Sequence, residues 1–312
     1  MGLLVNGTWT DQWYDTDATG GRFERQESVY RDWVRADGES LYQPEAGRYH
    51  LYVSLACPWA HRTLIFRKLK GLEDAITVSV VEPLMLGNGW TLAPGADPVN
   101  GARFLHQVYT AMEPDFTGRV TVPVLWDRNT GRIVSNESAD IIRMFNSEFA
   151  PLSSGPDYDP EDLRDEVNAL NARIYDTVNN GVYKAGFATT QAAYEEAFDA
   201  LFESLDWLDD LLSQRRYLAG DRMTEADWRL FTTLIRFDAV YYGHFKCNAR
   251  RIVDYRHLPG YVRELYQVPG VAETVNFDHI KTHYYGSHRT INPTGIVPKG
   301  PLLDLTAPHL RS

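Results

Sequence analysis

Residues 49–81 decide the fold of this chain, and they read YHLYVSLACPWAHRTLIFRKLKGLEDAITVSVV. Residues 49–55 are β-branched and aromatic with partial alternation, which predicts a strand. Residues 58–70 carry apolar side chains at a helical spacing and end in a basic turn before Gly71, which predicts a helix. Residues 76–81 predict a second strand. A strand, a helix and a strand this close together favour a right-handed βαβ unit with parallel strands.

The region that follows this unit predicts the rest of a small mixed sheet. Residues 82–118 form a long loop rich in Gly and Pro, with one short helical stretch at 103–112. Loops this long in a compact domain are usually functional. Residues 120–126 and 132–135 predict the two strands of a hairpin, and a helix is predicted at 139–145. We therefore expect a mixed sheet with helices on its faces.

Two changes in the sequence pattern divide the chain into three parts. Residues 1–45 are polar and turn-rich without a clear period, which predicts an extension laid over a domain. Residues 151–160 include Ser-Ser-Gly-Pro and indicate a linker. Beyond the linker the pattern predicts helices at 161–179, 190–214, 228–242, 261–267 and 271–283, with a capping-type start at 224–227. The predicted organisation is an N-terminal extension (1–45), an α/β domain (46–150) and an all-α domain with an irregular tail (151–312).

The composition excludes several classes of protein. The 312 residues include 31 Lys and Arg against 42 Asp and Glu, a net charge of −11. This acidity argues against nucleic acid and anionic membranes as partners, because both require a basic surface. The sequence holds no long apolar run of a membrane span and no recognisable targeting signal at its start. With only two cysteines, a disulfide framework is not expected and the reducing cytoplasm is the predicted location.

Cys57 is the sharpest chemical feature of the sequence. It lies between a predicted strand and a predicted helix, directly before Pro58, a residue suited to the first helical position. The helix dipole and the unpaired N–H groups of the first turn favour a thiolate, so we expect a thiol pKa below the ordinary value of about 8.5. The alternative is a buried cysteine that acts as a small hydrophobic residue.

The residue three positions after Cys57 determines the kind of thiol chemistry. A dithiol motif has the pattern Cys-x-x-Cys, whereas Ala60 stands at the last position here. A mixed disulfide on Cys57 must therefore be resolved by an outside thiol, which predicts a monothiol cycle that consumes a small thiol. Cys247 is the only internal alternative, and its place in the helical region favours a structural role.

Two further motifs are suited to binding a small peptide. In Thr121-Val122-Pro123, a proline within a strand is tolerated at an edge, a bulge or a cis turn, which leaves the backbone of Val122 for an extended ligand. Ser138 lies at the start of a predicted helix that its side chain could cap, while the N–H groups there bind a carboxylate and Glu137 could bind an ammonium. The plain alternatives are an edge-strand proline and an ordinary helix cap. Trp90 and Arg119 could add an aromatic wall and a second carboxylate partner.

These motifs resemble those of the glutathione transferases, which join a thioredoxin-like domain to a helical domain. Within that superfamily the chain resembles the glutathionyl-hydroquinone reductases, the Xi class. The resemblance extends from residue 23 to about residue 290 in matching order. It rests on residues 57–62, 118–126, 135–138, 176–187 and 226–229.

The resemblance implies roles for individual residues. Cys57 would be the nucleophile that takes glutathione off a glutathionylated hydroquinone. The residues that would hold glutathione are Trp90, Arg119, Val120, Thr121, Val122, Pro123, Glu137 and Ser138. The resemblance also implies a homodimer, and glutathione as the co-substrate without a metal.

Proton transfer is a second requirement of this reaction. When a thiolate attacks the sulfur of an aryl thioether, the aromatic carbon leaves with its electron pair and must be protonated by a nearby acid, and the quinol oxygens need hydrogen bonds. Residues in the helical region offer phenols for both tasks, with Tyr183 as the acid and substrate-binding phenols in the pairs Tyr241–Tyr242 and Tyr284–Tyr285. The resemblance favours Tyr183, Tyr241 and Tyr284, and Tyr183 is distinguished by preceding Lys184 and Gly186 in a predicted turn rather than in an apolar stripe. For any single tyrosine, however, core packing is the commoner role.

A metal site and two rival functions are the alternatives to this prediction. His279, His283 and His288 lie close in sequence but lack a recognisable ligand spacing, which favours solvated residues at a helix end over metal ligands. The predicted function is the reduction of glutathionyl-hydroquinones through a Cys57 mixed disulfide. The rivals are a conjugating or dehalogenating glutathione transferase, and a non-enzymatic binding protein with the same fold.

Overall fold

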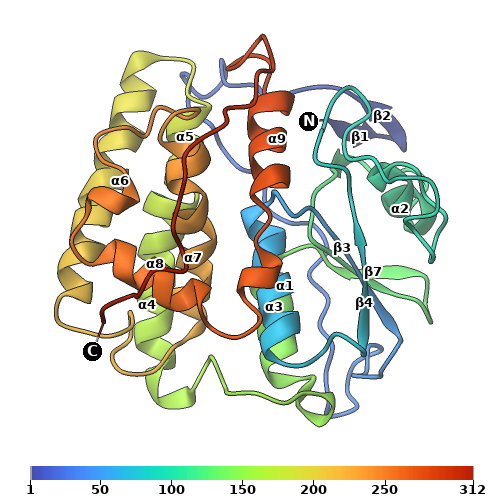
Figure 1. The fold of residues 1–312 in the computed structure, drawn as a ribbon. Coiled ribbons are helices and arrows are strands. Elements are labelled where there is room, and N and C mark those ends of the chain that lie inside the picture. The colour runs from blue at the N-terminus through green and yellow to red at the C-terminus, as the bar shows by residue number, and fades with distance from the viewer. Residues whose placement is uncertain (1, 312) are drawn as a thin grey trace. The chain divides into compact units, whose positions relative to one another are not determined.

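The computed structural model describes residues 2–311, which form two compact units (Figure 1). The first unit contains the described residues up to Trp13, Gln26–Pro156 and Thr274–His283. The second contains Tyr14–Arg25, Asp157–Glu273 and the described residues from Tyr284 onward. Each unit therefore draws on several separate segments of the chain.

A four-stranded mixed sheet forms the centre of the first unit. Its strands are β3 (Tyr49–Val53), β4 (Ile76–Val80), β6 (Val124–Asp127) and β7 (Arg132–Ser135), in the order β4-β3-β6-β7. Strand β3 pairs in parallel with β4 and antiparallel with β6, and β6 pairs antiparallel with β7. All five residues of β3 are buried, as expected for a central strand covered on both faces. The predicted βαβ unit and mixed sheet are confirmed.

Three helices accompany this sheet, namely α1 (Pro58–Leu69), α2 (Leu105–Met112) and α3 (Ser138–Ser147), and α3 is followed by a short 3₁₀ turn, η1 (Ala150–Leu152). Helices α1 and α3 pack against each other, and Figure 1 shows them together on one side of the sheet. The buried face of α1 includes Ala60, Ile65 and Phe66, which the apolar spacing of the sequence anticipates. Cys57, which is half-buried, lies at the start of this helix.

The N-terminal segment corrects one prediction. Residues 1–45 were expected to lack regular structure, but β1 (Leu3–Val5) and β2 (Thr8–Thr10) form a hairpin that adds β5 (Gly118–Arg119) in the order β2-β1-β5. The turn has positive φ at Asn6 (46°) and Gly7 (73°), the conformation that Asn-Gly favours in a two-residue hairpin. Strands of three residues are too short for periodicity to reveal, but the Asn-Gly pair was an available signal.

Pro123 divides the strand predicted at 120–126. Strand β5 ends at Arg119, β6 begins at Val124, and the Val122–Pro123 peptide bond between them is cis. The cis turn is one of the three arrangements that the sequence allowed for this proline.

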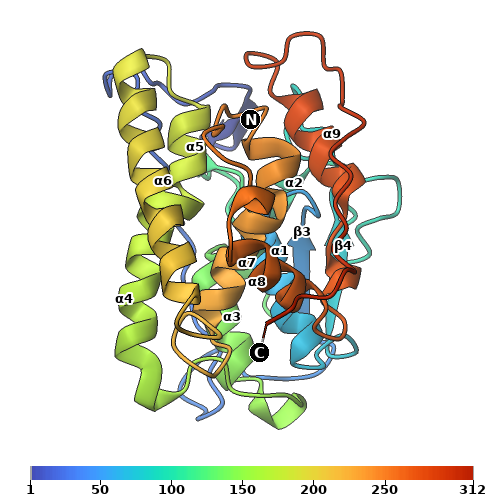
Figure 2. The same ribbon diagram turned by 60° about the vertical axis from the view of Figure 1, so that its left-hand side comes forward.

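The second unit is helical, as predicted. Its helices are α4 (Arg164–Ile174), α5 (Gly181–Gly186), α6 (Gln191–Leu212), α7 (Glu225–Arg236) and α8 (Leu258–Tyr266). Short 3₁₀ turns are η2 (Glu161–Leu163), η5 (Ile252–Asp254) and η6 (Ala272–Thr274). Helix α5 lies against α6, which Figure 2 shows from a second direction. Helix α7 is buried along its whole length, and the predicted capping box between Thr224 and Asp227 is present at its start.

Helix boundaries differ from the predictions at several places, among them the start of α8, which lies at Leu258 rather than at residue 261. The helices expected at 161–179 and 228–242 each end in a π-helical turn, η3 (Tyr175–Asn179) and η4 (Phe237–Tyr241). The helix expected at 271–283 is α9 (Phe277–Ser287), which begins later because the Asn276 side chain accepts the His279 N–H at 2.9 Å and caps it. No helix among residues 2–311 is both long and apolar enough to cross a membrane.

Candidate active site

Cys57 lies at the N-cap of α1, with φ −76° and ψ 123°, and Pro58 occupies the first helical position. Its backbone N–H donates to the Ser54 carbonyl at 3.1 Å. The side chain is half-buried, with Sγ 3.7 Å from the carbonyl oxygen of Val122. The thiol therefore stands at the positive end of a helix dipole and remains in contact with solvent. This position argues against a packed structural cysteine.

Cys247 has a different environment. It is fully buried, its Sγ lies 3.8 Å from the Phe245 carbonyl, and burial raises the pKa of its thiol far above the ordinary value. Such a thiol is a poor nucleophile. It is not joined to Cys57 in a disulfide, which agrees with the structural role predicted for it.

The bend at residues 121–123 is held by a buried tyrosine. The Tyr109 hydroxyl donates to the Thr121 carbonyl at 2.9 Å and lies 3.2 Å from the Thr121 N–H, while Asn136 Nδ2 donates to the same hydroxyl at 3.3 Å. The last pair of the β3–β6 ladder is Tyr52 with Val124, so Val122 lies beyond the ladder. Because the Val122 carbonyl faces Cys57, an extended ligand along this bend would place its sulfur beside the thiol.

The start of α3 corrects the predicted cap. Ser138 was expected to cap this helix, but Glu137 is the N-cap residue, and its Oε1 accepts the Ala139 N–H at 2.9 Å. Ser138 is the first helical residue, and its hydroxyl accepts from Arg62 Nη1 at 3.4 Å. Ser28 donates to the other oxygen of Glu137 at 3.1 Å. The longer carboxylate side chain reaches the first turn, so the Ser138 hydroxyl is not needed there.

Trp90 and Arg119 have partners that the sequence did not predict. Trp90 is 6% exposed and stacks on His283, with ring centroids 4.8 Å apart and planes 21° apart. The Arg119 guanidinium donates to the backbone carbonyls of Gln12 and Trp13. Arg119 therefore anchors the N-terminal segment within the first unit, and the ring of His283 covers one face of the Trp90 ring.

Three tyrosine hydroxyls meet in the second unit. The Tyr183 and Tyr284 oxygens are 2.5 Å apart, and those of Tyr284 and Tyr241 are 2.9 Å apart. Tyr183 comes from α5, Tyr241 from η4 and Tyr284 from α9. Burial raises the pKa of both Tyr241 and Tyr284 well above the ordinary value. We call these three residues the tyrosine cluster.

The structure thus distinguishes the members of each tyrosine pair. Tyr285 lies outside the cluster, with its hydroxyl 3.5 Å from the Ala239 carbonyl, and Tyr241 rather than Tyr242 faces Tyr284. Tyr183 lies in a short helix and is 9% exposed, so the expected turn at this position is wrong.

Two of the three histidines near the C-terminus, His283 and His288, are buried, which corrects the prediction that they are solvated, whereas His279 is partly exposed. His283 is 6% exposed, and its Nδ1 lies 3.0 Å from the Pro83 carbonyl. His288 is 4% exposed, and its Nδ1 is 3.1 Å from His244 Nε2. Within residues 2–311 no group of three or more His, Cys, Asp and Glu residues is arranged to hold a metal ion.

Family models identify the class of protein that this fold and thiol site define. The model described as "Glutathione S-transferase, N-terminal domain" matches residues 56–148, and "Glutathione S-transferase, C-terminal domain" matches residues 191–266. The chain is a member of the glutathione transferase superfamily, with a thioredoxin-like N-terminal domain and a helical C-terminal domain.

Individual relatives narrow this assignment. The chain is 58% identical to glutathionyl-hydroquinone reductase YqjG of Escherichia coli K12, over 100% of this chain and 98% of that protein. It is 56% identical to glutathionyl-hydroquinone reductase PcpF of Sphingobium chlorophenolicum, over 100% of both. The glutathione-bound structure of YqjG has a TM-score of 0.90 at 55% identity, covering 99% of both chains. A Xi class enzyme from Natrialba magadii has a TM-score of 0.93 at 49% identity, covering 99% of this chain and 96% of that one. The chain belongs to the glutathionyl-hydroquinone reductase family.

Proposed function

We propose that this protein reduces glutathionyl-hydroquinones to hydroquinones and uses glutathione as the reductant. The observation that carries the proposal is the half-buried Cys57 thiol at the N-terminus of α1, with Ala60 where a dithiol enzyme has its second cysteine. The glutathionyl-hydroquinone reductases at 56–58% identity over the full chain support it.

The reaction proceeds in two thiol-transfer steps. In the first, the Cys57 thiolate attacks the glutathionyl sulfur, the bond between that sulfur and the aromatic carbon breaks, and a Cys57–glutathione disulfide forms. The carbon leaves with the electron pair and takes up a proton, so the arene is reduced while the two sulfurs are oxidised. In the second, a glutathione thiolate attacks the glutathionyl sulfur of the mixed disulfide, which releases glutathione disulfide and restores the Cys57 thiolate.

The glutathione moiety is assigned to the residues around Cys57. The bend formed by Val120, Thr121, Val122 and Pro123 offers backbone groups beside the thiol, and the start of α3 offers N–H groups to a carboxylate. Glu137 and Ser138 lie at this helix start, Trp90 forms a wall, and Arg119 supplies positive charge. The glutathione-bound structure of the related YqjG supports this assignment.

The proton for the aromatic carbon is assigned to Tyr183. It is the most exposed member of the tyrosine cluster, and its hydroxyl is paired with that of Tyr284 at 2.5 Å. As Tyr183 gives up its proton, the Tyr284 hydroxyl can turn to donate to the phenolate, and Tyr241 can donate to Tyr284 in turn. A chain of phenols therefore stabilises the developing charge.

The proposal predicts that Cys57→Ser abolishes release of hydroquinone from a glutathionyl-hydroquinone in the presence of glutathione. A hydroxyl does not form the mixed disulfide, so the rate should fall by about three orders of magnitude or more. Hydroquinone release followed by chromatography measures this, and Cys247→Ala is the matched control that keeps the wild-type rate. Wild type and Cys57→Ser that are equally inert would refute the enzymatic proposal.

A separate measurement distinguishes the two rival functions. A conjugating transferase would retain conjugation of glutathione to an electrophile such as an aryl halide at full rate after Cys57→Ser. A non-enzymatic binding protein would show Cys57 alkylation by iodoacetamide no faster than that of free cysteine. The proposed reductase requires a faster alkylation, because its thiolate is favoured by the helix terminus.

We also propose that the chain forms a homodimer and acts in the cytoplasm. The family resemblance supports the dimer, and the two thiols without a disulfide support a reducing compartment. Sedimentation equilibrium should give twice the chain mass at micromolar concentration. A single-chain mass under these conditions would refute the dimer.

A further inference from the structure

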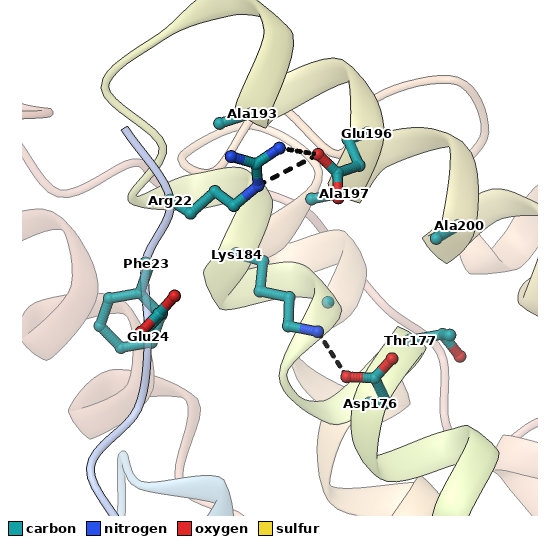
Figure 3. A pocket seen from close by; sticks show the side chains of 11 residues that line it. Arg22, Phe23, Glu24, Asp176, Thr177, Lys184, Ala193, Glu196, Ala197 and Ala200 are labelled. Atoms are coloured by element: carbon teal, nitrogen blue, oxygen red, sulfur yellow. Dashed lines mark hydrogen bonds and ion pairs between the residues drawn. The ribbon is translucent and has the colours of Figure 1, made fainter. Parts of the chain in front are cut away.

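The segment of residues 21–25 lies against α5, the helix that carries Tyr183, and against α6. The Thr189 N–H donates to the Gly21 carbonyl at 3.0 Å, and Arg22 forms a two-pronged ion pair with Glu196 of α6 at 3.2 and 2.7 Å. Arg22 and Glu196 line a cavity of about 330 Å³ together with residues of η3, α5 and α6. Figure 3 shows their ion pair among the side chains of this cavity. We call Gly21–Arg25 the strap.

Two strap residues contact the tyrosine cluster directly. Phe23 is 4% exposed, and its ring centroid is 6.4 Å from that of Tyr183. The Arg25 guanidinium carbon lies 4.8 Å from the Tyr183 ring centroid. Its Nε donates to the Asn180 side-chain oxygen at 2.9 Å, and Asn180 immediately precedes α5. A half-buried cation is therefore fixed over the face of the ring.

We propose that Arg25 is a positioning residue for the reduction: it stabilises the negative charge that Tyr183 acquires when it gives its proton to the aromatic carbon. This inference rests on the proposed function, because it assumes that Tyr183 is the acid. A cation over a phenol ring attracts a phenolate more strongly than a neutral phenol, since the phenolate carries a full charge at a short distance. The interaction is thus stronger after proton transfer than before it, which is what accelerates a chemical step.

The other groups that face Tyr183 do not replace this cation. The phenols of Tyr284 and Tyr241 supply neutral hydrogen bonds, and Arg236 acts on these two phenols. Lys184, the next residue in α5, is paired with Asp176 at 2.5 Å, as Figure 3 shows. Arg22 is likewise paired with Glu196 on the exposed rim of the cavity. The Arg25 guanidinium lies over the Phe23 and Tyr183 rings and donates to the side-chain oxygen of Asn180.

A second substrate separates the proton transfer to the aromatic carbon from the attack by Cys57. The mixed disulfide of glutathione and 2-mercaptoethanol has a sulfur leaving group, so Cys57 attack releases a thiolate and no carbon has to be protonated. The same Cys57–glutathione disulfide results in both reactions. If Arg25 acts through Tyr183, its removal should slow the reaction of the aryl thioether and spare that of the mixed disulfide.

The test compares Arg25→Met, Arg25→Lys, Tyr183→Phe and Arg22→Met on both substrates. Arg25→Met should lower kcat for the glutathionyl-hydroquinone about tenfold and leave the mixed-disulfide rate within twofold of wild type. The alkaline limb of its rate profile, where the acid is lost, should move to higher pH, and Arg25→Lys should recover part of the rate. Arg22→Met is the matched control in the same strap, and it should behave as wild type because its ion pair is exposed.

Each of the other possible outcomes would overturn part or all of the proposal. Equal losses on both substrates, or an unmoved pH profile, would show that Arg25 is only structural and would overturn the inference. A slow Tyr183→Phe beside a normal Arg25→Met would overturn the role of Arg25 alone. A Tyr183→Phe variant at the wild-type rate would remove Tyr183 as the acid and Arg25 with it. A wild-type protein that is active only on the mixed disulfide would refute the proposed function itself.

Discussion

At the scale of single residues, His283 lies outside the predicted site but contacts one of its residues, Trp90. Its Nδ1 faces the Pro83 carbonyl at 3.0 Å, and a carbonyl can only accept, so Nδ1 must carry the proton. With the ring orientation fixed in this way, its face stacks on Trp90 at 4.8 Å. The histidine therefore holds the aromatic wall that we assign to glutathione.

His283→Ala should weaken glutathione binding about threefold to tenfold, because Trp90 loses the ring on which it stacks. His283→Phe keeps a ring and should lose less. Titration calorimetry with glutathione measures both without turnover, and His279→Ala, one turn earlier in α9, is the control. An affinity unchanged in His283→Ala would show that Trp90 keeps its position by other contacts.

The residues of the thiol site differ in how far sequence could predict them. Cys57, Pro123 and Glu137 were singled out because the signals that mark them are local: a helix terminus or a strand interruption is visible in the neighbouring residues. Arg25 and His283 were missed because their partners are distant in sequence. Arg25 meets Asn180, which lies 155 residues further on, and His283 meets Pro83 across 200 residues. No local pattern encodes these contacts.

At the scale of elements, a buried ion pair joins the chain just before β3 to the end of β6. Arg48 donates to both carboxylate oxygens of Asp127 at 2.7 and 2.8 Å, and Asp127 is fully buried. Burial pulls the pKa of Asp127 upward, but hydrogen bonds from Arg48, Thr130 and the Asn129 N–H outweigh it and hold the pKa below the ordinary value. Removing one partner would leave an uncompensated charge in the interior.

Arg48→Met should lower the free energy of unfolding by about 3–5 kcal/mol, measured as a lower urea midpoint. Because the folded-state pKa of Asp127 is depressed, its stabilising contribution is present above the unfolded value of about 3.9 and is lost as the pH falls through the folded value. The difference between wild type and variant should therefore shrink in acid.

The matched control for this pair is Arg251→Met, which breaks an exposed pair with Asp254 and should cost less than about 1 kcal/mol. An equal decrease in the free energy of unfolding in both variants would show that burial does not determine how much an ion pair contributes to stability. A difference between wild type and Arg48→Met that stays constant down to pH 2 would contradict the assignment to Asp127.

The accuracy of the predicted elements followed the strength of their patterns. Strands β3, β4 and β7 and helix α1 were found within two residues at each end, because their apolar spacing is regular and turn residues bound them. The π-helical turns at 175–179 and 237–241 were missed, since one extra residue within a helical turn hardly disturbs a 3.6-residue period. The pairing of Tyr284 with Tyr183 also depends on packing across 101 residues.

At the scale of the whole molecule, the net charge of −11 opposes the approach of anions. The positive end of α1 attracts them, but that effect falls off within one turn of the helix. The field of the whole chain extends about 30 Å at 0.01 M salt and about 8 Å at 0.15 M. The repulsion should therefore dominate the encounter at low ionic strength.

Raising the salt from about 0.01 to 0.15 M should increase Cys57 alkylation by anionic iodoacetate relative to neutral iodoacetamide, by about twofold to threefold. Rates followed by mass spectrometry on the Cys247→Ala variant measure this ratio, and free cysteine provides the reference. A ratio that falls with salt would mean that local positive charge governs access to the thiol.

Cys57 has no second thiol that could reduce its mixed disulfide, because Ala60 stands where a dithiol enzyme has its second cysteine and Cys247 is fully buried. When glutathione runs short, the proposed reaction halts with the reactive sulfur capped as a mixed disulfide. A sulfur in that form is shielded from irreversible overoxidation to the sulfinic and sulfonic acids. A low glutathione concentration would thus hold the protein as an inactive mixed disulfide, and activity would return when the glutathione concentration rises again.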